Sequence, residues 1–205
     1  MPIVKVRLGD YDARMKTRSV ALFDLVERLG NLIRASLRAA GSAHGLQPVH
    51  IQALMYLAEA NRYSNTPQAL GEYLGLTKGT VSQSVLLLAR KKLVARQADA
   101  HDGRVVRLFL TDSGAAFLRQ LNVAGTWRDA LQAASPARIN SAAVVLRQLL
   151  GKLQQQSGKR TFGVCATCQH NQRLGPRTYL CGLTRERLSS PEARKICREH
   201  APPAG

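Results

Sequence analysis

The four cysteines of this 205-residue chain all fall in one short stretch near its C-terminal end. They are Cys165, Cys168, Cys181 and Cys197, which gives the spacing C-x2-C-x12-C-x15-C. Cysteines that only filled a hydrophobic core would be scattered along the chain. A disulfide framework is disfavoured in a reducing cytosol, so four thiolates around a metal are the best account of this grouping.

Two kinds of cofactor suit four thiolates: a single Zn²⁺ ion and an iron–sulfur cluster. Zinc ribbons usually carry two C-x2-C pairs, whereas this chain has only the pair Cys165 and Cys168. The spacing resembles that of high-potential-type [4Fe–4S] proteins, although the sequence around it does not match them closely. We therefore expect a [4Fe–4S] cluster, with zinc as the alternative and reactive thiols or a disulfide switch as a third interpretation. His170 and His200 could each replace a cysteine, although surface positions are expected for both.

The cysteines lie in a region whose composition differs from the rest of the chain. Periodic apolar patterns end at Ser157-Gly158, and no long helical pattern follows. Residues 158–205 therefore form a small separate module. Because a region of this size with few large apolar residues cannot build a sufficient core alone, it should fold together with its metal.

A helix-turn-helix pattern with a β-hairpin precedes this module. A helix is expected from Pro67 to Leu74, with Thr66 as its N-cap and Gly75 ending it. Thr77 caps the next helix, which runs to about residue 92. Two strands follow, around a polar turn at 99–104. The second helix of such a pair can lie in the major groove of DNA, and the hairpin can add contacts beside it.

The exposed face of that second helix and the hairpin carry short polar side chains and cations. Hydroxyls and an amide can bond base edges, a glycine permits close approach, and cations can neutralise phosphates. Lys92 and His101 belong to the same basic surface. The expected DNA-binding residues are Thr77, Lys78, Gly79, Thr80, Ser82, Gln83, Arg90, Lys91, Arg96, Asp102, Arg104 and Arg107.

The charge of the whole chain points to the same kind of partner. Its 30 Lys and Arg against 13 Asp and Glu give 30 − 13 = +17, which suits a polyanion. Only 5% of the residues are aromatic, which argues against stacking platforms for single strands or RNA loops. Double-stranded DNA is the expected partner.

The remaining helical patterns predict a dimer. A broad apolar stripe runs through residues 19–40, helices follow at 48–60 and 111–133, and another apolar stripe runs from Ser135 to Leu153. The first stripe is wider than one neighbouring helix requires, so a homodimer contact is expected. The fold class is mainly α with a small β-hairpin wing: a basic arm at 1–18, a winged-helix and dimerisation domain at 19–157, and the cysteine module.

Several of these segments resemble one known family. Gly71–Ser82 resembles the helix-turn-helix of MarR-type transcriptional regulators, and Lys92–Arg96, Asp102–Arg104 and Leu108–Gly114 are similar to that family's wing and its exit into the next helix. The resemblance covers about residues 19–153. It implies a winged-helix homodimer that binds a pseudo-palindromic operator and is usually released by a signal. The basic arm and the cysteine module depart from the family's pattern.

The resemblance also gives roles to two wing residues. It makes Asp102 an orienting carboxylate and Arg104 an arginine of the minor groove. The local pattern agrees, because an Asp two residues before an Arg in a tight hairpin can hold the guanidinium in one pose. A purely turn-stabilising Asp is the alternative.

Other function classes fit the sequence less well. There is no Ser/His/Asp set, Gly-rich phosphate loop or carboxylate cluster, so we expect no enzyme. A non-specific architectural DNA-binding protein is the main alternative to a regulator, and a regulator with a purely structural zinc site is another. No apolar run or signal peptide points to a membrane or to export, so a cytoplasmic protein is expected.

Overall fold

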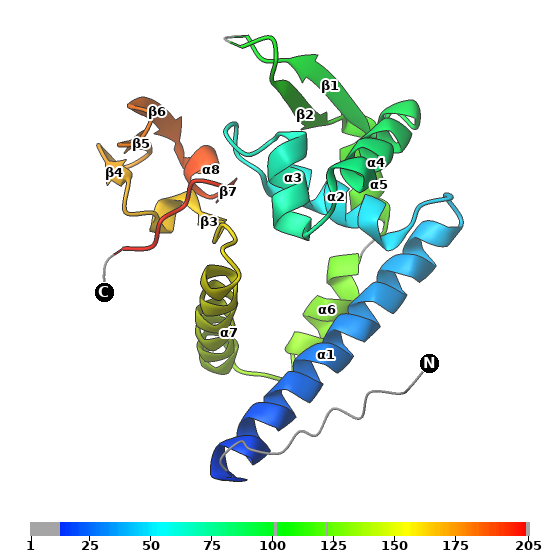
Figure 1. Ribbon diagram of the computed structural model, residues 1–205, viewed down its shortest axis with the longest axis vertical. Helices are drawn as coiled ribbons and strands as arrows, with labels where there is room; N and C mark the ends of the chain where they lie inside the picture. The colour runs from blue at the N-terminus through cyan, green and yellow to red at the C-terminus, as the bar shows by residue number, and fades with distance from the viewer. Residues whose placement is uncertain (1–12, 101, 122, 204–205) are drawn as a thin grey trace, which may run out of the picture. The chain divides into compact units, whose positions relative to one another are not determined.

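The computed structural model describes residues 13–100, 102–121 and 123–203 (Figure 1). The chain divides after Pro48 into two compact units. The helices are α1 (Ala13–Ser42), α2 (Pro48–Glu59), α3 (Pro67–Leu74), α4 (Lys78–Arg90), α5 (Asp112–Leu121), α6 (Val123–Leu131), α7 (Pro136–Gln156) and α8 (Ser190–Ala193), with one short 3-10 helix, η1 (Cys165–Thr167). The strands are β1 (Val94–Ala98), β2 (Val106–Leu110), β3 (Gly163–Val164), β4 (Asn171–Arg173), β5 (Thr178–Cys181), β6 (Glu186–Ser189) and β7 (Ile196–Cys197).

Helix α1 begins at Ala13, six residues before the expected start at Ser19. Residues 13–18 include Ala, Arg, Met and Lys and contain no glycine or proline, so nothing in them opposes a helix. The expected basic arm at 1–18 is therefore helical over its last residues, and 1–12 lie outside the described part of the chain. Large apolar side chains remain exposed on α1: Val20, Leu22, Phe23, Leu25, Val26, Leu29, Leu32 and Ile33.

The helix-turn-helix forms where the sequence predicts it. The hydroxyl of Thr66 accepts a hydrogen bond from the N–H of Ala69 at 3.2 Å and caps α3. Gly75 ends that helix in the left-handed conformation, with φ of 67°, which glycine adopts without strain. Thr77 caps α4 in the same way. Apolar residues of α2, α3 and α4 form the core, among them Ile51, Leu54, Leu70, Val81 and Leu88.

The wing is an antiparallel hairpin that leads directly into α5. Strand β1 pairs with β2, from Val94 opposite Leu110 to Ala98 opposite Val106. The hydroxyl of Thr111 donates to the carbonyl of Lys92 at 2.7 Å and accepts from the N–H of Gly114 at 3.0 Å. This cap fixes the exit from the wing at the position expected for it.

The single helix expected at 111–133 is present as two helices, α5 and α6, on either side of residue 122, which is outside the described residues. Helix α7 is capped by Ser135, as expected. None of the α7 side chains is buried. Its exposed apolar residues are Val144, Val145, Leu146, Leu149, Leu150 and Leu153.

Residues beyond 158 form short strands and no long helix, as the sequence predicts. Strands β4, β5 and β6 make an antiparallel sheet, and β3 pairs with β7. The buried centre of this module consists of Cys165, Leu188 and Cys197. Helices with small antiparallel hairpins thus make up the fold, which confirms the expected fold class. In the described ranges, no helix has the length and apolar character needed to cross a membrane.

Gly114 allows the start of α5 to approach the wing. A Cβ atom there would meet the backbone carbonyl oxygen of Leu93 at 2.2 Å. We therefore expect Gly114→Ala to lower the free energy of unfolding by about 1–3 kcal/mol, since backbone has to move. Thermal unfolding tests this against Gly79→Ala, whose added methyl would have only the Thr77 hydroxyl at 4.0 Å. Equal melting temperatures for the two variants would contradict this account of the wing junction.

Candidate functional site

The outer face of α4 presents the polar side chains that the sequence predicts. Thr77, Lys78, Gly79, Thr80, Ser82 and Gln83 are all exposed, as are Arg90 and Lys91 at the other end of the helix. The Thr77 hydroxyl accepts from the N–H of Thr80 at 3.3 Å, so Thr77 caps the helix, and the two threonine hydroxyls lie 2.9 Å apart. The inner face of the same helix is buried at Val81, Val85 and Leu88. The helix is therefore fixed on one side and free to contact a partner on the other.

The wing carries the expected pair of Asp102 and Arg104. The guanidinium donates to both carboxylate oxygens, with Nε at 3.0 Å from Oδ1 and Nη2 at 3.1 Å from Oδ2. The hydrogen bond from Arg104 lowers the pKa of Asp102, so the carboxylate stays charged. The Arg104 side chain is 91% exposed. The structure thus pairs Arg104 with Asp102 as the sequence predicts, and the contact of Arg104 with DNA stays a prediction.

These two surfaces meet in one open groove of about 1190 Å³. Helix α4 contributes Lys78 and Ser82, and the wing contributes Arg96 and Arg104. The linker residues 158–160 line the same groove and add two cations. Four of the predicted DNA-binding residues thus lie around one concave, positively charged surface.

Arg107 has a structural role that the sequence does not indicate. Its Nε donates to Asp99 at 2.6 Å, and its Nη1 donates to the carbonyl of Arg62 at 2.7 Å and to Asn65 Oδ1 at 3.3 Å. Because Nε and Nη1 are both engaged inside the protein, Arg107 holds the wing to the loop between α2 and α3. A contact of Arg107 with DNA stays a prediction. His101, which was expected to contribute to this surface, lies outside the described residues.

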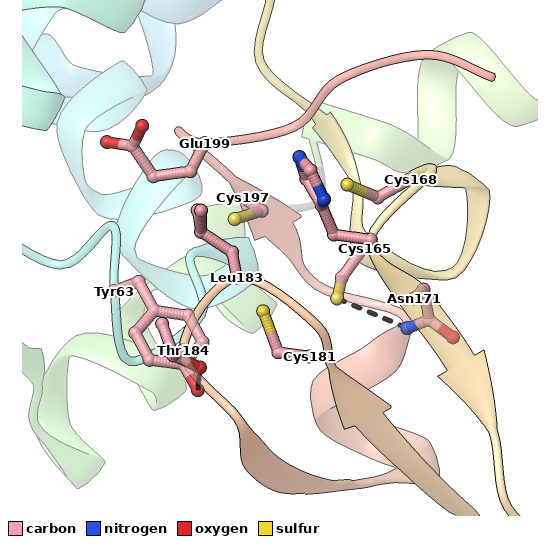
Figure 2. Close-up of a pocket in the computed structure, with 10 residues that line it drawn as sticks. Tyr63, Cys165, Cys168, Asn171, Cys181, Leu183, Thr184, Cys197 and Glu199 are labelled. Atoms are coloured by element: carbon pink, nitrogen blue, oxygen red, sulfur yellow. Dashed lines mark hydrogen bonds between the residues drawn. The ribbon is translucent and has the colours of Figure 1, made fainter. Parts of the chain in front are cut away.

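The four cysteines line one cavity of about 80 Å³. Figure 2 shows their sulfur atoms turned towards one another around this space. Cys165 begins the 3-10 helix η1, Cys168 follows it, Cys181 ends β5 and Cys197 ends β7. The strand pairs of the module thus bring together residues up to 32 positions apart, as the spacing predicts.

Hydrogen bonds within the module already point at two of these sulfur atoms. Asn171 Nδ2 donates to Cys165 Sγ at 3.4 Å, and the N–H of Ala201 donates to Cys168 Sγ at 3.5 Å. Burial raises the pKa of the Cys165 thiol, and the contact with Asn171 opposes that shift. Burial also raises the pKa of Cys197. Two N–H groups of the module therefore donate to cysteine sulfur atoms at the cavity.

The two histidines differ in their relation to the cavity. His170 lines it. His200 is half-buried: its ring lies against Gly163, and its Nε2 is 3.0 Å from the Thr167 hydroxyl. Burial lowers the pKa of His200. Within the described chain, no group of three or more His, Cys, Asp or Glu side chains is positioned to hold one metal ion.

The cysteine module is packed against the helix-turn-helix through an ion pair that the sequence does not reveal. Arg198, next to Cys197, donates from Nε and Nη2 to the two carboxylate oxygens of Glu72 in α3, at 2.6 and 2.8 Å. This two-pronged contact lowers the pKa of Glu72 and raises that of Arg198. The ring of Phe162 also stacks edge-on against Tyr73 of α3, with centroids 5.2 Å apart.

The loop between α2 and α3 makes further contacts with the module. Arg62 pairs with Glu192 at 3.0 Å, and the Tyr63 hydroxyl donates to Glu186 at 2.6 Å. Burial, followed by that hydrogen bond, raises the pKa of Tyr63 to about 12. Tyr63 also lines the cysteine cavity. The sequence predicts a separate module, yet these contacts make the module and the winged helix parts of one compact unit.

Comparisons with known proteins support the prediction of a helix-turn-helix. A model described as the MarR family matches residues 44–105. No curated protein matches the chain. Among solved structures, a MarR-family transcriptional regulator from Silicibacter pomeroyi is 23% identical, with a TM-score of 0.60 over 70% of this chain and 96% of its own.

Two further structures show the same likeness. A MarR transcriptional regulator from Methanosarcina mazei Go1 is 20% identical, with a TM-score of 0.55 over 65% of this chain and 96% of its own. The S. aureus MepR–DNA complex is 21% identical, with a TM-score of 0.55 over 63% of this chain and 94% of its own. At these identities the structures establish the fold, and the family model adds the sequence match. The chain therefore has a winged-helix fold, and its residues 44–105 are similar in sequence to the MarR family.

Proposed function

We propose that this protein is a sequence-specific DNA-binding transcriptional regulator, whose activity is binding and not catalysis. The exposed face of α4 beside the anchored Arg104 carries this proposal. An α-helix with short polar side chains fits the major groove, and an arginine on a hairpin fits the neighbouring minor groove. The similarity to MepR, whose structure is a complex with DNA, supports the same mode of binding.

We also propose that the regulator is a homodimer that binds two half-sites about one helical turn apart. The apolar side chains left exposed on α1 and α7 support it, since rows of this kind on a monomer mark an interaction surface. A symmetric pair of winged helices would present two copies of α4 to a pseudo-palindromic operator.

The cysteine cavity supports a bound cofactor in the C-terminal module. Four thiols with converging sulfur atoms form a donor set suited to thiophilic metals. Zinc ribbons usually carry two C-x2-C pairs, whereas this chain has only the pair Cys165 and Cys168. We therefore propose that Cys165, Cys168, Cys181 and Cys197 hold an iron–sulfur cluster of the [4Fe–4S] type, with zinc as the alternative.

A cluster of this kind would supply one-electron redox chemistry and sensitivity to O₂, NO and iron supply. The chain's own residues would bind it, donate hydrogen bonds to its thiolates and connect it to the helix-turn-helix through Arg198 and Glu72. On this basis the regulator responds to redox state, O₂, NO or iron status. A structural zinc would leave DNA affinity insensitive to those signals.

The Asp102–Arg104 pair gives a test of DNA recognition. Binding sites are first selected from random duplex DNA with the wild-type protein. Arg104→Ala should then lower affinity for the selected site on the order of tenfold or more. Asp102→Asn should also weaken binding, because the guanidinium loses its anchor, although the change removes a negative charge near DNA. Arg119→Ala, which removes an exposed cation from α5, should have little effect.

Stronger binding by Asp102→Asn would show that the carboxylate does not orient Arg104. Failure of the selection to enrich any sequence, together with a steep salt dependence, would support the architectural alternative.

The exposed apolar rows predict dimerisation. In sedimentation experiments the wild type should behave as twice the 22.4 kDa chain. Leu32→Glu in α1 and Leu153→Glu in α7 should shift it to the monomer, because each places a charge within the apolar surface. Gln148→Glu introduces the same charge at an exposed polar position of α7 and should remain dimeric. A wild-type monomer at micromolar concentration would overturn the proposal.

The cysteine site predicts cofactor loss on single substitution. Cys165→Ser, Cys168→Ser, Cys181→Ser and Cys197→Ser should each lose bound metal and expose the chain beyond residue 159 to protease. The helix content of the winged-helix domain should remain, because its core of Ile51, Leu54 and Leu70 lies outside the module. Metal analysis, absorption and EPR spectra after anaerobic purification provide the measurements. Wild-type protein without any metal would overturn the cofactor proposal, and one zinc per chain would select the alternative.

A further inference from the structure

One wall of the cysteine cavity belongs to the winged-helix domain. Tyr63 lines the cavity with the four cysteines, and its ring packs against the buried cluster that contains Cys165 and Cys197. The strand that carries Cys197 is also fixed to this wall, because the N–H of Asn61 donates to the carbonyl of Ile196 at 2.9 Å. The loop between α2 and α3 therefore borders the place where a cofactor would bind.

The Asn61 side chain in this wall has one defined orientation. Its Oδ1 accepts hydrogen bonds from the Ser64 hydroxyl at 2.7 Å and from the N–H of Tyr63 at 3.1 Å. Since the oxygen is held by two donors, Nδ2 has to point the other way. Asn61 is 2% exposed, and its Nδ2 is one of the few buried polar atoms in the described residues without a hydrogen-bond acceptor. Such an unsatisfied donor is costly in a folded protein.

Cys197 lies between two residues that this loop binds. The carbonyl of Ile196 accepts from the Asn61 N–H at 2.9 Å, and the N–H of Arg198 donates to the Ser64 hydroxyl that binds Asn61 Oδ1. A protonated thiol is a weak hydrogen-bond acceptor, whereas a metal-bound thiolate carries charge and is a good one. The orphaned donor would therefore gain its acceptor when Cys197 becomes a ligand.

We infer that Asn61 is a positioning residue of the cysteine site, whose Nδ2–H donates to the Cys197 thiolate when the four cysteines hold their cofactor. This inference rests on the proposed cofactor site. Asn171 makes the corresponding contact with Cys165 from within the module. Hydrogen bonds to ligating sulfur orient the ligand and tune the bound metal. The DNA-binding domain thus supplies part of the cofactor's surroundings.

A continuous set of contacts leads from this position to the helix-turn-helix. The Ser64 hydroxyl that donates to Asn61 also accepts from the N–H of Arg198 at 2.7 Å. Arg198 in turn binds Glu72 of α3. These contacts connect the surroundings of Cys197 with α3.

The test compares two buried asparagines of the same loop. Asn61→Asp keeps the oxygen that Ser64 and Tyr63 bind but removes the Nδ2 donor. Asn65→Asp makes the same change at a residue that is 6% exposed and whose Oδ1 is bound by Arg107. Anaerobically purified Asn61→Asp should release its metal to excess EDTA about 10- to 100-fold faster than the wild type. Asn65→Asp should release it at the wild-type rate.

A second variant guards against failure of Asn61→Asp to fold. Asn61→Ala removes the donor without introducing a charge and should also accelerate metal release. Wild-type release rates in both Asn61 variants, or equal acceleration in Asn65→Asp, would overturn the inference while leaving the cofactor site intact. Wild-type protein that contains no metal would instead overturn the proposed cofactor site, and the inference with it.

Discussion

Five consecutive residues between α2 and α3, 61–65, hold three parts of the protein in place. The carbonyl of Asn65 accepts from the N–H of Leu108 in the wing, and the carbonyl of Ser64 accepts from the Tyr56 hydroxyl of α2. Asn61 and Ser64 hold the end of the cysteine module. Because Asn61, Ser64 and Asn65 are buried, each of their polar groups needs a partner. That requirement ties together segments that are far apart in the sequence.

This arrangement explains how a module with so small a core stays attached to the larger domain. Its buried centre contains two cysteines and only one large aliphatic side chain. The contacts with Arg62, Tyr63 and Glu72 add polar and aromatic surface that the module lacks by itself. The winged helix thus supports the cysteine module. The module in turn contacts α3, the helix that precedes α4, through the pair of Arg198 and Glu72.

The parts of the fold that the sequence predicts are those decided by local chemistry. The caps at Thr66 and Thr77 and the left-handed Gly75 depend on residues within one helical turn, and all three were predictable. The gathering of the cysteines followed from their shared chemistry. The pairing of Glu72 with Arg198 joins residues 126 positions apart, and neither residue carries a local signal of it.

The same distinction applies to Arg107 and Asn61. Arg107 belongs to a basic hairpin, and nothing in its neighbours indicates that Asp99 and a distant loop engage it. Asn61 appears in the sequence as an ordinary loop residue, and only the fold shows that it is buried and bound to Ile196, the neighbour of Cys197.

Helix α7 has 21 residues, and none of its side chains is buried. A helix without packing is marginal in water, so in the proposed homodimer the second protomer supplies its order. Dilution then dissociates the dimer and removes the packing of α7, so the midpoint of thermal unfolding rises with protein concentration.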